Sequence, residues 1–140
     1  MFLLDTNVLF AMMAARPAVE ISTWVAAQAP DVLFTTTVCQ AEILAGLAIM
    51  PAGRRKADLE AAARAVFTED FDGRVWTFDA AAASAHAAIL ATRRRSGRPI
   101  ATIDLMIGAI ARSRGAAVVT RNVPDFDGYG LTIVNPWDVA

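Results

Sequence analysis

Short apolar runs alternate along this chain with longer segments whose apolar residues recur at helical spacing. The apolar runs have the length of buried strands and fall at residues 1–4, 31–34, 74–78, 116–120 and 131–134. Helices are expected at residues 6–15, from Pro17 toward Pro30, and at residues 37–50, 54–67, 79–95 and 102–114. Strands that alternate with helices form parallel sheets with helices over both faces. The pattern therefore predicts an α/β fold around a parallel sheet of about five strands.

The helix expected at residues 102–114 has the clearest ends. Asp104 lies in its first turn, where a negative charge is favourable, and Arg112 and Arg114 lie in its last turn. Gly115 follows at a position where helices commonly end. In the preceding helix Asp79 stands directly before a run of alanines, so helix capping is a sufficient role for that carboxylate.

Length and hydropathy bound the class of protein. At 140 residues the chain has the size of one domain, residues 1–140, and is long enough to bury a substantial core. The mean hydropathy is +0.42, but no apolar run approaches the ~18 residues that span a membrane. Asp5 interrupts the first apolar run, which also lacks the basic leader of a secretory signal. We therefore expect a cytoplasmic protein without membrane association.

Cysteine content and charge exclude two further classes. Cys39 is the only cysteine, so the chain forms no internal disulfide and no cysteine-based zinc cluster, which suits a reducing compartment. We expect Cys39 to be a packing residue. The formal net charge of −1 gives no general attraction to nucleic acid. A nucleic-acid partner would have to be held by local patches or by metal.

Acidic and amide side chains follow the predicted strands at one end. Asp5 ends the first strand, Glu42 lies on the helix after the second, and Asn122 and Asp125 follow the fourth. Because the carboxyl ends of parallel strands share one edge, these groups approach each other, and Asp104 can join them from a helix N-terminus. Hard oxygen ligands of this kind hold Mg²⁺ or Mn²⁺, which assist phosphodiester hydrolysis. The pattern favours a metal site.

Each acid also has a structural explanation. Asp5 could cap the following helix, and Asp104 in a first turn favours the helix dipole without any metal. Glu42, however, lies on or beside the apolar stripe of its helix, which a surface glutamate should avoid. Asp104 shares its face with Ile107 and Gly108 and therefore points inward as well. The inward positions favour a functional role for the set.

Two basic clusters, at residues 54–56 and 93–98, could contact phosphates, although charge runs are usually solvated helix faces. The second lies at a predicted helix C-terminus, where cations are favourable in any case. Arg121, beside Asn122 and beyond a strand end, is better placed to meet a phosphate near the metal. No Ser-His-Asp, Cys-His, P-loop or GxGxxG arrangement stands out, so hydrolysis through a covalent nucleophile is unsupported.

Five segments form a specific set through their order and spacing, although each is weak alone. They are Leu4-Asp5-Thr6-Asn7-Val8, Ala41-Glu42-Ile43-Leu44-Ala45-Gly46, Ile103-Asp104-Leu105-Met106-Ile107-Gly108-Ala109-Ile110-Ala111, Thr120-Arg121-Asn122-Val123-Pro124-Asp125-Phe126 and Val134-Asn135-Pro136-Trp137. Together they resemble PIN domains, specifically VapC-type toxins of type II toxin–antitoxin pairs, close to the subgroup that includes FitB. The resemblance covers nearly the whole chain.

The resemblance implies an α/β/α sandwich around a parallel sheet, a homodimer, and a Mg²⁺- or Mn²⁺-dependent endoribonuclease. Such an RNA-cutting toxin is silenced by a cognate antitoxin, which often has a DNA-binding half. By that likeness Asp5, Glu42 and Asp104 are the metal-binding acids and belong with Asn122 to the catalytic set. Asn122 stands where many members have Asp and adds no negative charge. Asp125 is therefore the alternative fourth ligand.

Two other classes compete with this interpretation. A binding module that keeps the fold without turnover is favoured by Asn122, because the fourth acid is missing there. A phosphotransfer domain of haloacid-dehalogenase type is suggested by Asp5-Thr6-Asn7 after the first strand. That class needs a second Asp at position 7 and a well-placed lysine, and Lys56 is the only lysine.

Overall fold

A computed structural model describes residues 1–138 of the chain. The strands are β1 (Phe2–Leu4), β2 (Leu33–Thr36), β3 (Val75–Trp76), β4 (Ala117–Val119) and β5 (Ile133–Val134). The α-helices are α1 (Thr6–Met13), α2 (Val19–Ala26), α3 (Thr37–Ile49), α4 (Arg54–Ala65), α5 (Ala80–Arg95), α6 (Thr102–Arg114) and α7 (Val123–Phe126). A 3-10 turn, η1 (Pro30–Val32), precedes β2, and a π-helical turn, η2 (Val66–Asp70), follows α4.

The five strands form one parallel sheet in the order β3-β2-β1-β4-β5. Phe2 of β1 pairs with Leu33 of β2 on one side and with Ala117 of β4 on the other. The chain thus builds outward from β1 to β3 and then crosses to the opposite side of β1 to add β4 and β5. The α/β fold with about five parallel strands, predicted from the sequence, is confirmed.

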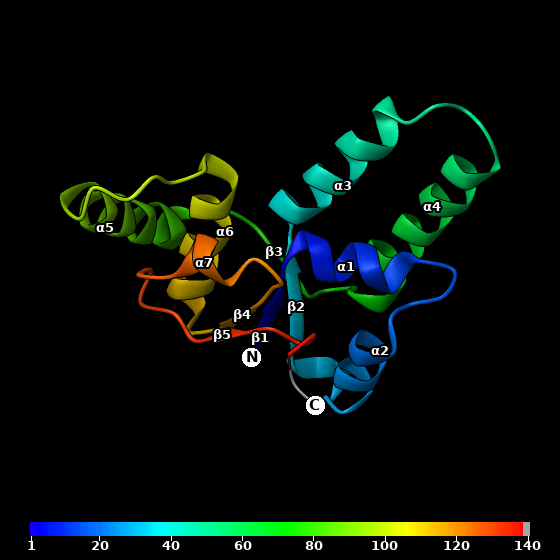
Figure 1. The fold of residues 1–140 in the computed structure, drawn as a ribbon, viewed down its shortest axis with the longest axis horizontal. Helices are drawn as coiled ribbons and strands as arrows, with labels where there is room; N and C mark the ends of the chain where they lie inside the picture. The colour runs from blue at the N-terminus through cyan, green and yellow to red at the C-terminus, as the bar shows by residue number, and fades with distance from the viewer. Residues whose placement is uncertain (139–140) are drawn as a thin grey trace.

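Helices cover both sides of the sheet (Figure 1), with α1 to α4 on one side and α5 and α6 on the other. Right-handed crossovers explain this division, because reversing the direction in which strands are added places the connecting helices on the opposite face. The two sets of helices approach each other where α3 contacts α6. This arrangement leaves the carboxyl edge of β1 and β4 between the two sets.

The strand predicted at residues 31–34 begins two residues later than expected. Pro30 starts the 3-10 turn η1 instead, and β2 runs from Leu33 to Thr36. The Arg74 guanidinium holds this turn by donating to the carbonyl oxygens of Pro30, at 2.6 Å, and of Leu33. A side chain 41 residues from Leu33 in sequence therefore holds the turn at the point where the strand begins.

Two further elements differ from the sequence prediction: the edge strand β3 is shorter, and the helix α7 is additional. Of the strand predicted at residues 74–78, only Val75 and Trp76 pair with β2, because β3 lies at the edge of the sheet. The short helix α7 was not predicted, since four residues are too few to show a periodicity. By contrast, α6 begins and ends as predicted, and Gly115 closes it with a φ of 66°.

The core is centred on β1 and β4, where Leu3, Leu4, Val118 and Val119 are fully buried. Cys39 packs against this region, is fully buried as predicted, and burial raises the pKa of its thiol to about 11. Within residues 1–138 no helix is both long and apolar enough to cross a membrane. The buried central strands give the residues at their carboxyl ends a rigid base.

Candidate active site

The candidate site lies at the carboxyl ends of β1 and β4, where the order of the strands reverses. Ligands of open α/β folds bind at such switch points, because the loops that leave the two strands diverge and open a crevice. Asp5 follows β1 directly, and its backbone N–H donates to the Val119 carbonyl at 2.9 Å. Thr120 follows β4 and is fully buried beside it. The two inner strands therefore deliver one acid and one hydroxyl to the same point.

Asp5 is held by three donors in a nearly closed environment, with 4% of its surface exposed. Its Oδ1 accepts from the Thr6 backbone N–H at 2.8 Å, while Oδ2 accepts from the Thr120 hydroxyl at 2.8 Å and the Asn7 amide at 3.1 Å. Burial raises the pKa of Asp5, and the hydrogen bonds oppose that shift in part. Asp5 thus caps α1, as the structural explanation proposed, but the cap uses only one of its oxygens.

A second layer of hydrogen bonds ties Asp5 to the loop after β4. The Asn7 side chain also donates to the Thr120 hydroxyl at 3.2 Å and accepts from the Arg121 backbone N–H at 3.1 Å. The Asn122 backbone N–H donates to the same Thr120 hydroxyl at 3.0 Å. Because the two Asn7 contacts join residues 113 and 114 positions apart in sequence, they fix Asn122 relative to Asp5.

Glu42 reaches the site from α3. Thr36 caps this helix by accepting from the Cys39 N–H at 3.0 Å, so the helix starts directly after β2. The Thr6 hydroxyl donates to Glu42 Oε1 at 2.5 Å and so links the first turn of α1 to α3. Glu42 is half-buried, which agrees with the inward position predicted from the apolar stripe.

Asp104 approaches from the first turn of α6, on the opposite side of the sheet. Partial burial, together with the negative charges of Asp5, Asp125 and Glu42, raises its pKa to about 6. The other three carboxylates are therefore close enough to disfavour the charged form of Asp104. In the described part of the chain, no cationic side chain forms a salt bridge with Asp5, Glu42 or Asp104.

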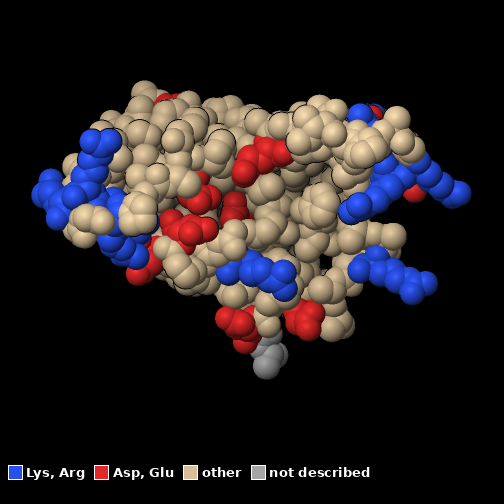
Figure 2. All heavy atoms as spheres, turned by 45° about the horizontal axis from the view of Figure 1, so that its top comes forward, with Lys and Arg blue, Asp and Glu red and all other residues tan. Residues whose placement is uncertain are grey.

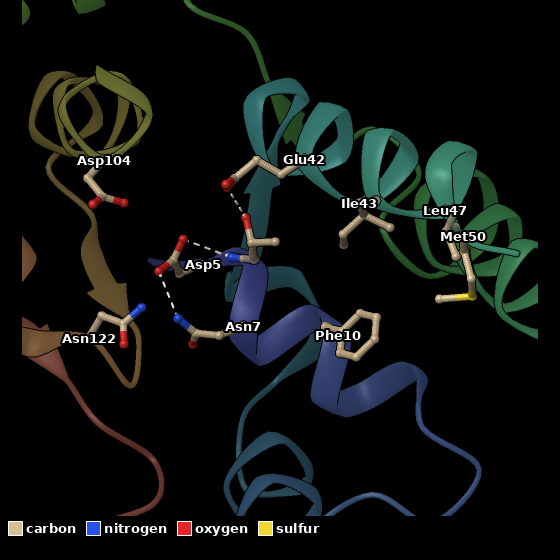
Figure 3. A pocket seen from close by; sticks show the side chains of 11 residues that line it. Asp5, Asn7, Phe10, Glu42, Ile43, Leu47, Met50, Asp104 and Asn122 are labelled. Atoms are coloured by element: carbon tan, nitrogen blue, oxygen red, sulfur yellow. Dashed lines mark hydrogen bonds between the residues drawn. The ribbon is translucent and has the colours of Figure 1, made fainter. Parts of the chain in front are cut away.

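One cavity of about 490 Å³ collects most of the predicted site residues. Its polar side is lined by Asp5, Thr6, Asn7, Glu42, Asp104 and Asn122. Figure 3 shows the carboxylates of Asp5, Glu42 and Asp104 and the amide of Asn122 arranged around this space. Asp125 lies outside the lining, on α7, although its charge acts on Asp104. Figure 2 shows acidic side chains gathered in a hollow near the middle of this face, with most Lys and Arg side chains toward the left and right edges of the molecule and one basic group just below the hollow.

The donor set fits a hard divalent cation in its chemistry. Every polar side chain that lines the cavity carries an oxygen atom. Mg²⁺ and Mn²⁺ prefer carboxylate and carbonyl oxygens as ligands. Over residues 1–138, however, no three acidic, histidine or cysteine side chains converge into a ready coordination cluster. The carboxylates of Asp5, Glu42 and Asp104 line the same cavity, and a bound cation would reduce the electrostatic repulsion between them.

Sequence reasoning did not assign roles to three residues that organise the site: Thr6, Asn7 and Thr120. Thr6 orients Glu42, and the other two hold Asp5. Only their positions could have marked them in the sequence. Thr6 and Asn7 follow the acid that ends the first strand, and Thr120 follows an inner strand. Threonine and asparagine are common at such turns for local reasons, so only the tertiary contacts distinguish them.

A comparison with known families decides the classification. The family model of the PIN domain matches residues 2–127. The chain belongs to the PIN-domain family. This PIN domain is 37% identical over 138 residues to the plasmid stability protein StbB of Pseudomonas syringae pv. tomato, covering 99% of both chains. It is 35% identical to the VapC ribonuclease Y4jK of Sinorhizobium fredii, covering 100% of both. The resemblance to VapC-type PIN domains is confirmed, and the haloacid-dehalogenase alternative is set aside.

Solved structures agree with this assignment. FitAcB from Neisseria gonorrhoeae superposes with a TM-score of 0.91 at 27% identity and covers 99% of this chain and 100% of its own. DNA-bound VapBC from Salmonella typhimurium gives a TM-score of 0.77 at 26% identity and covers 96% and 97%. The PIN-like arrangement predicted from the sequence is therefore confirmed over nearly the whole chain.

The basic cluster at residues 93–98 is not uniformly a surface cluster. Arg93 is only 5% exposed, and its guanidinium donates to the carbonyl oxygens of Asp127, at 2.5 Å, and Pro99, at 2.7 Å. The same group lies over the ring of Tyr129, 5.1 Å from its centroid. The suggestion that this cluster contacts phosphates is therefore wrong for Arg93. Arg93 instead fastens the loops that precede α6 and follow α7 in the PIN domain.

We expect Arg93→Met to lower the free energy of unfolding by about 2 to 3 kcal/mol, because the buried Arg93 side chain loses its charged hydrogen bonds to two carbonyl oxygens. Urea unfolding followed by circular dichroism measures the change. Arg94→Met is the matched control, since Arg94 is exposed one position away on the same helix, and it should change stability by less than about 0.5 kcal/mol. Equal effects of the two substitutions would contradict the structural role of Arg93.

Asp104 makes the stability of the metal-free PIN domain depend on pH. Its ordinary pKa of 3.8 rises to about 6 in the fold, mainly through burial. The folded protein therefore holds this proton more tightly than the unfolded chain does. The resulting stabilisation is fully present below about pH 4 and is lost as the pH rises through about 6. We expect Asp104→Asn to raise the melting temperature in EDTA at pH 7, with a gain that shrinks toward pH 4. A gain that is the same at both pH values would contradict this origin.

Proposed function

We propose that this PIN domain is a metal-dependent endoribonuclease that acts as the toxin of a type II toxin–antitoxin pair. The observation that carries the proposal is the meeting of Asp5, Glu42 and Asp104, from three separate elements, in one cavity at the switch point of the sheet. Family membership and the VapC ribonuclease relative support it. The substrate is RNA, and the reaction is hydrolysis of its phosphodiester bonds.

In this proposal Asp5, Glu42 and Asp104 hold Mg²⁺ or Mn²⁺. When bound, such an ion supplies activation of a water molecule and neutralisation of charge that develops on the phosphate. The Asn122 carbonyl oxygen is a fourth donor on the lining of the cavity, and Asp125 is an outer acid that can replace it. Thr6 orients the carboxylate of Glu42, and Thr120 with Asn7 keeps Asp5 ionisable by donating to it.

The exposed cations complete the proposed substrate site. Arg121 adjoins Asn122, and its guanidinium lies over Trp137 at 4.3 Å from the ring centroid, which limits where it can reach. A phosphate beside the carboxylates would meet such a cation at the rim of the hollow. Arg94 and Arg95 are exposed at the end of α5 and are available to more distant phosphates.

The proposed partners are a cognate antitoxin with a DNA-binding half and a second copy of this chain. The relatives support the antitoxin, because the similar VapBC of Salmonella typhimurium was solved bound to DNA and StbB is a plasmid stability protein. The second copy is proposed from the resemblance to VapC-type toxins alone. An antitoxin would silence the toxin until the complex dissociates. Co-purification with the antitoxin and the mass of the complex in solution test the two partners.

Incubation of the purified protein with a mixed RNA pool in Mg²⁺, Mn²⁺ or EDTA tests the reaction. We expect cuts in the presence of either metal and none in EDTA, because EDTA removes the ion that would activate a water molecule and neutralise developing charge. Asn122 favours one second candidate, a binding module without turnover, since it removes one negative charge from the usual acidic set. Absence of cuts from folded protein in every metal would favour that module over the nuclease.

A further inference from the structure

The cavity that contains the carboxylates has a second, apolar half. On α1, Thr6 and Phe10 are four residues apart and share one face of the helix. On α3, Glu42 and Gly46 repeat the same spacing, and Met50 follows as the residue that caps the end of this helix. All five line the same cavity. Figure 3 shows the consequence: the polar end lies around Asp5 and Glu42, and the apolar end lies between Phe10 and the last turn of α3.

Phe10 is unusually accessible for an aromatic residue of this protein. Its side chain is 42% exposed, and it takes part in none of the aromatic pairs found within residues 1–138. Burying an aromatic ring normally stabilises a protein, so an exposed ring in a cavity keeps a surface available to a ligand. Buried Ile43 and Leu47 form the wall that faces it.

Gly46 keeps this half of the cavity open. It lies in the middle of α3, where glycine is less favourable than alanine by roughly 0.5 to 1 kcal/mol. A Cβ at Gly46 would meet no atom within 4 Å, and its φ is not positive, so neither packing nor backbone geometry requires a glycine there. A side chain at this position would instead enter the free space of the cavity that Gly46 and Phe10 both line.

We propose that the apolar half is a nucleobase subsite, in which a base next to the scissile phosphate stacks on Phe10. This inference rests on the proposed ribonuclease function and adds the recognition of the substrate to it. The subsite is continuous with the carboxylates, so a phosphate held there would place the neighbouring base over Phe10. Single-stranded RNA is commonly held by stacking its bases on aromatic side chains, and this stacking tolerates different bases.

The subsite is tested with one intact RNA and two variants of it that each lack a single base. After the cleaved bond has been mapped, the base on each side of it is removed in turn, leaving an abasic ribose. For wild type we expect kcat/KM to fall about 10- to 100-fold when the stacked base is absent, which is the range of one stacking contact. Phe10→Ala should lower kcat/KM on the intact RNA by a similar factor and should show no further loss on the abasic RNA. Phe10→Tyr should restore the discrimination.

A substitution that fills the cavity provides an independent test. Gly46→Leu should reduce cleavage of intact RNA and bring it to the level of the abasic RNA, because the side chain occupies the place of the base. Ala45→Leu is the matched control, since Ala45 is exposed on the same helix and outside the cavity lining. Thermal melts establish that each variant is folded. Saturation-transfer NMR with adenosine, which has a base and no phosphate, should show binding to wild type and not to Phe10→Ala.

The outcomes separate this inference from the function on which it rests. Wild type that cuts intact and abasic RNA equally would overturn the subsite and leave the ribonuclease standing. Equal losses of Phe10→Ala on both RNAs would also overturn it, because the effect would then be independent of the base. Gly46→Leu that cuts normally but no longer binds a partner protein would assign the cavity to protein docking. No cleavage of any RNA in any metal would overturn the proposed function, and the subsite with it.

Discussion

Asp5→Asn is expected to reduce metal-dependent RNA cleavage by at least about 100-fold while the protein stays folded. The substitution removes one negative charge at the centre of the cavity and nearly preserves the shape of the side chain. Asp5 is the acid that the fold holds most firmly, with donors from Thr6, Asn7 and Thr120. Gel analysis of labelled RNA with Mg²⁺ or Mn²⁺ measures the loss.

The fold should tolerate Asp5→Asn because two effects oppose each other. An amide nitrogen would face one of the present donors, which lowers stability by about 1 to 3 kcal/mol. The burial that raises the pKa of Asp5 disfavours its charged form, and the neutral amide relieves this penalty. We therefore expect only a small change in the melting temperature of the metal-free protein. Addition of Mg²⁺ should raise the melting temperature of wild type more than that of the variant.

Asp79→Asn is the matched control for this experiment. Asp79 also follows a strand and caps a helix, since its Oδ1 accepts from the Ala82 N–H at 3.0 Å, but it does not line the cavity. Asparagine caps helices about as well as aspartate. The control should therefore cut RNA like wild type. Equal activity of both variants would remove Asp5 from the proposed metal site.

Gly108→Ala is expected to lower the free energy of unfolding by about 2 to 4 kcal/mol, although alanine is the better helix former. A Cβ at Gly108 would lie 2.3 Å and 2.7 Å from two ring carbons of Tyr129. The ring cannot move away easily, because Tyr129 is fully buried and the Arg93 guanidinium lies 5.1 Å from its centroid. The strain would act on α6 one turn after Asp104. Denaturant unfolding measures the change.

A glycine-to-alanine substitution in another helix distinguishes the clash with Tyr129 from the general effect of replacing a helical glycine. Gly46→Ala on α3 places a Cβ in open space and should raise the free energy of unfolding by up to about 1 kcal/mol. Tyr129→Leu should make room for the methyl group that Gly108→Ala adds, so the double variant should be less unstable than the sum of the two single changes. A strictly additive pair would show that the Tyr129 ring is not the obstacle.

Local patterns predicted those elements whose ends are marked in the sequence itself. The helix α6 has an acid in its first turn, arginines in its last and Gly115 after it, and the structure reproduces all of these features. Asp79 caps α5 as expected. The strand β2 shows the limit of such reasoning, because its start depends on hydrogen bonds from Arg74, which no local pattern contains.

The residues of the candidate site also divide into those that local patterns predicted and those that only tertiary contacts revealed. The sequence placed Asp5, Glu42, Asp104 and Asn122 at one edge, because the position of an acid after a strand or on an apolar stripe is a local property. The choice of Thr120 and Asn7 as the residues that hold Asp5 needed the tertiary structure. It also took the fold to bury Arg93 and to leave Asp125 outside the cavity lining.

By itself, then, the sequence determined the alternation of strands and helices and the family, and it predicted the acids of the proposed metal site. Only the tertiary structure decided the order of the strands, and with it the crevice between β1 and β4 in which those acids meet. It alone also brought Phe10 and Gly46 to the lining of one cavity. The physical reason is that periodicity and capping act within a few residues, whereas a cavity is formed by side chains that chain crossovers bring together from distant parts of the sequence.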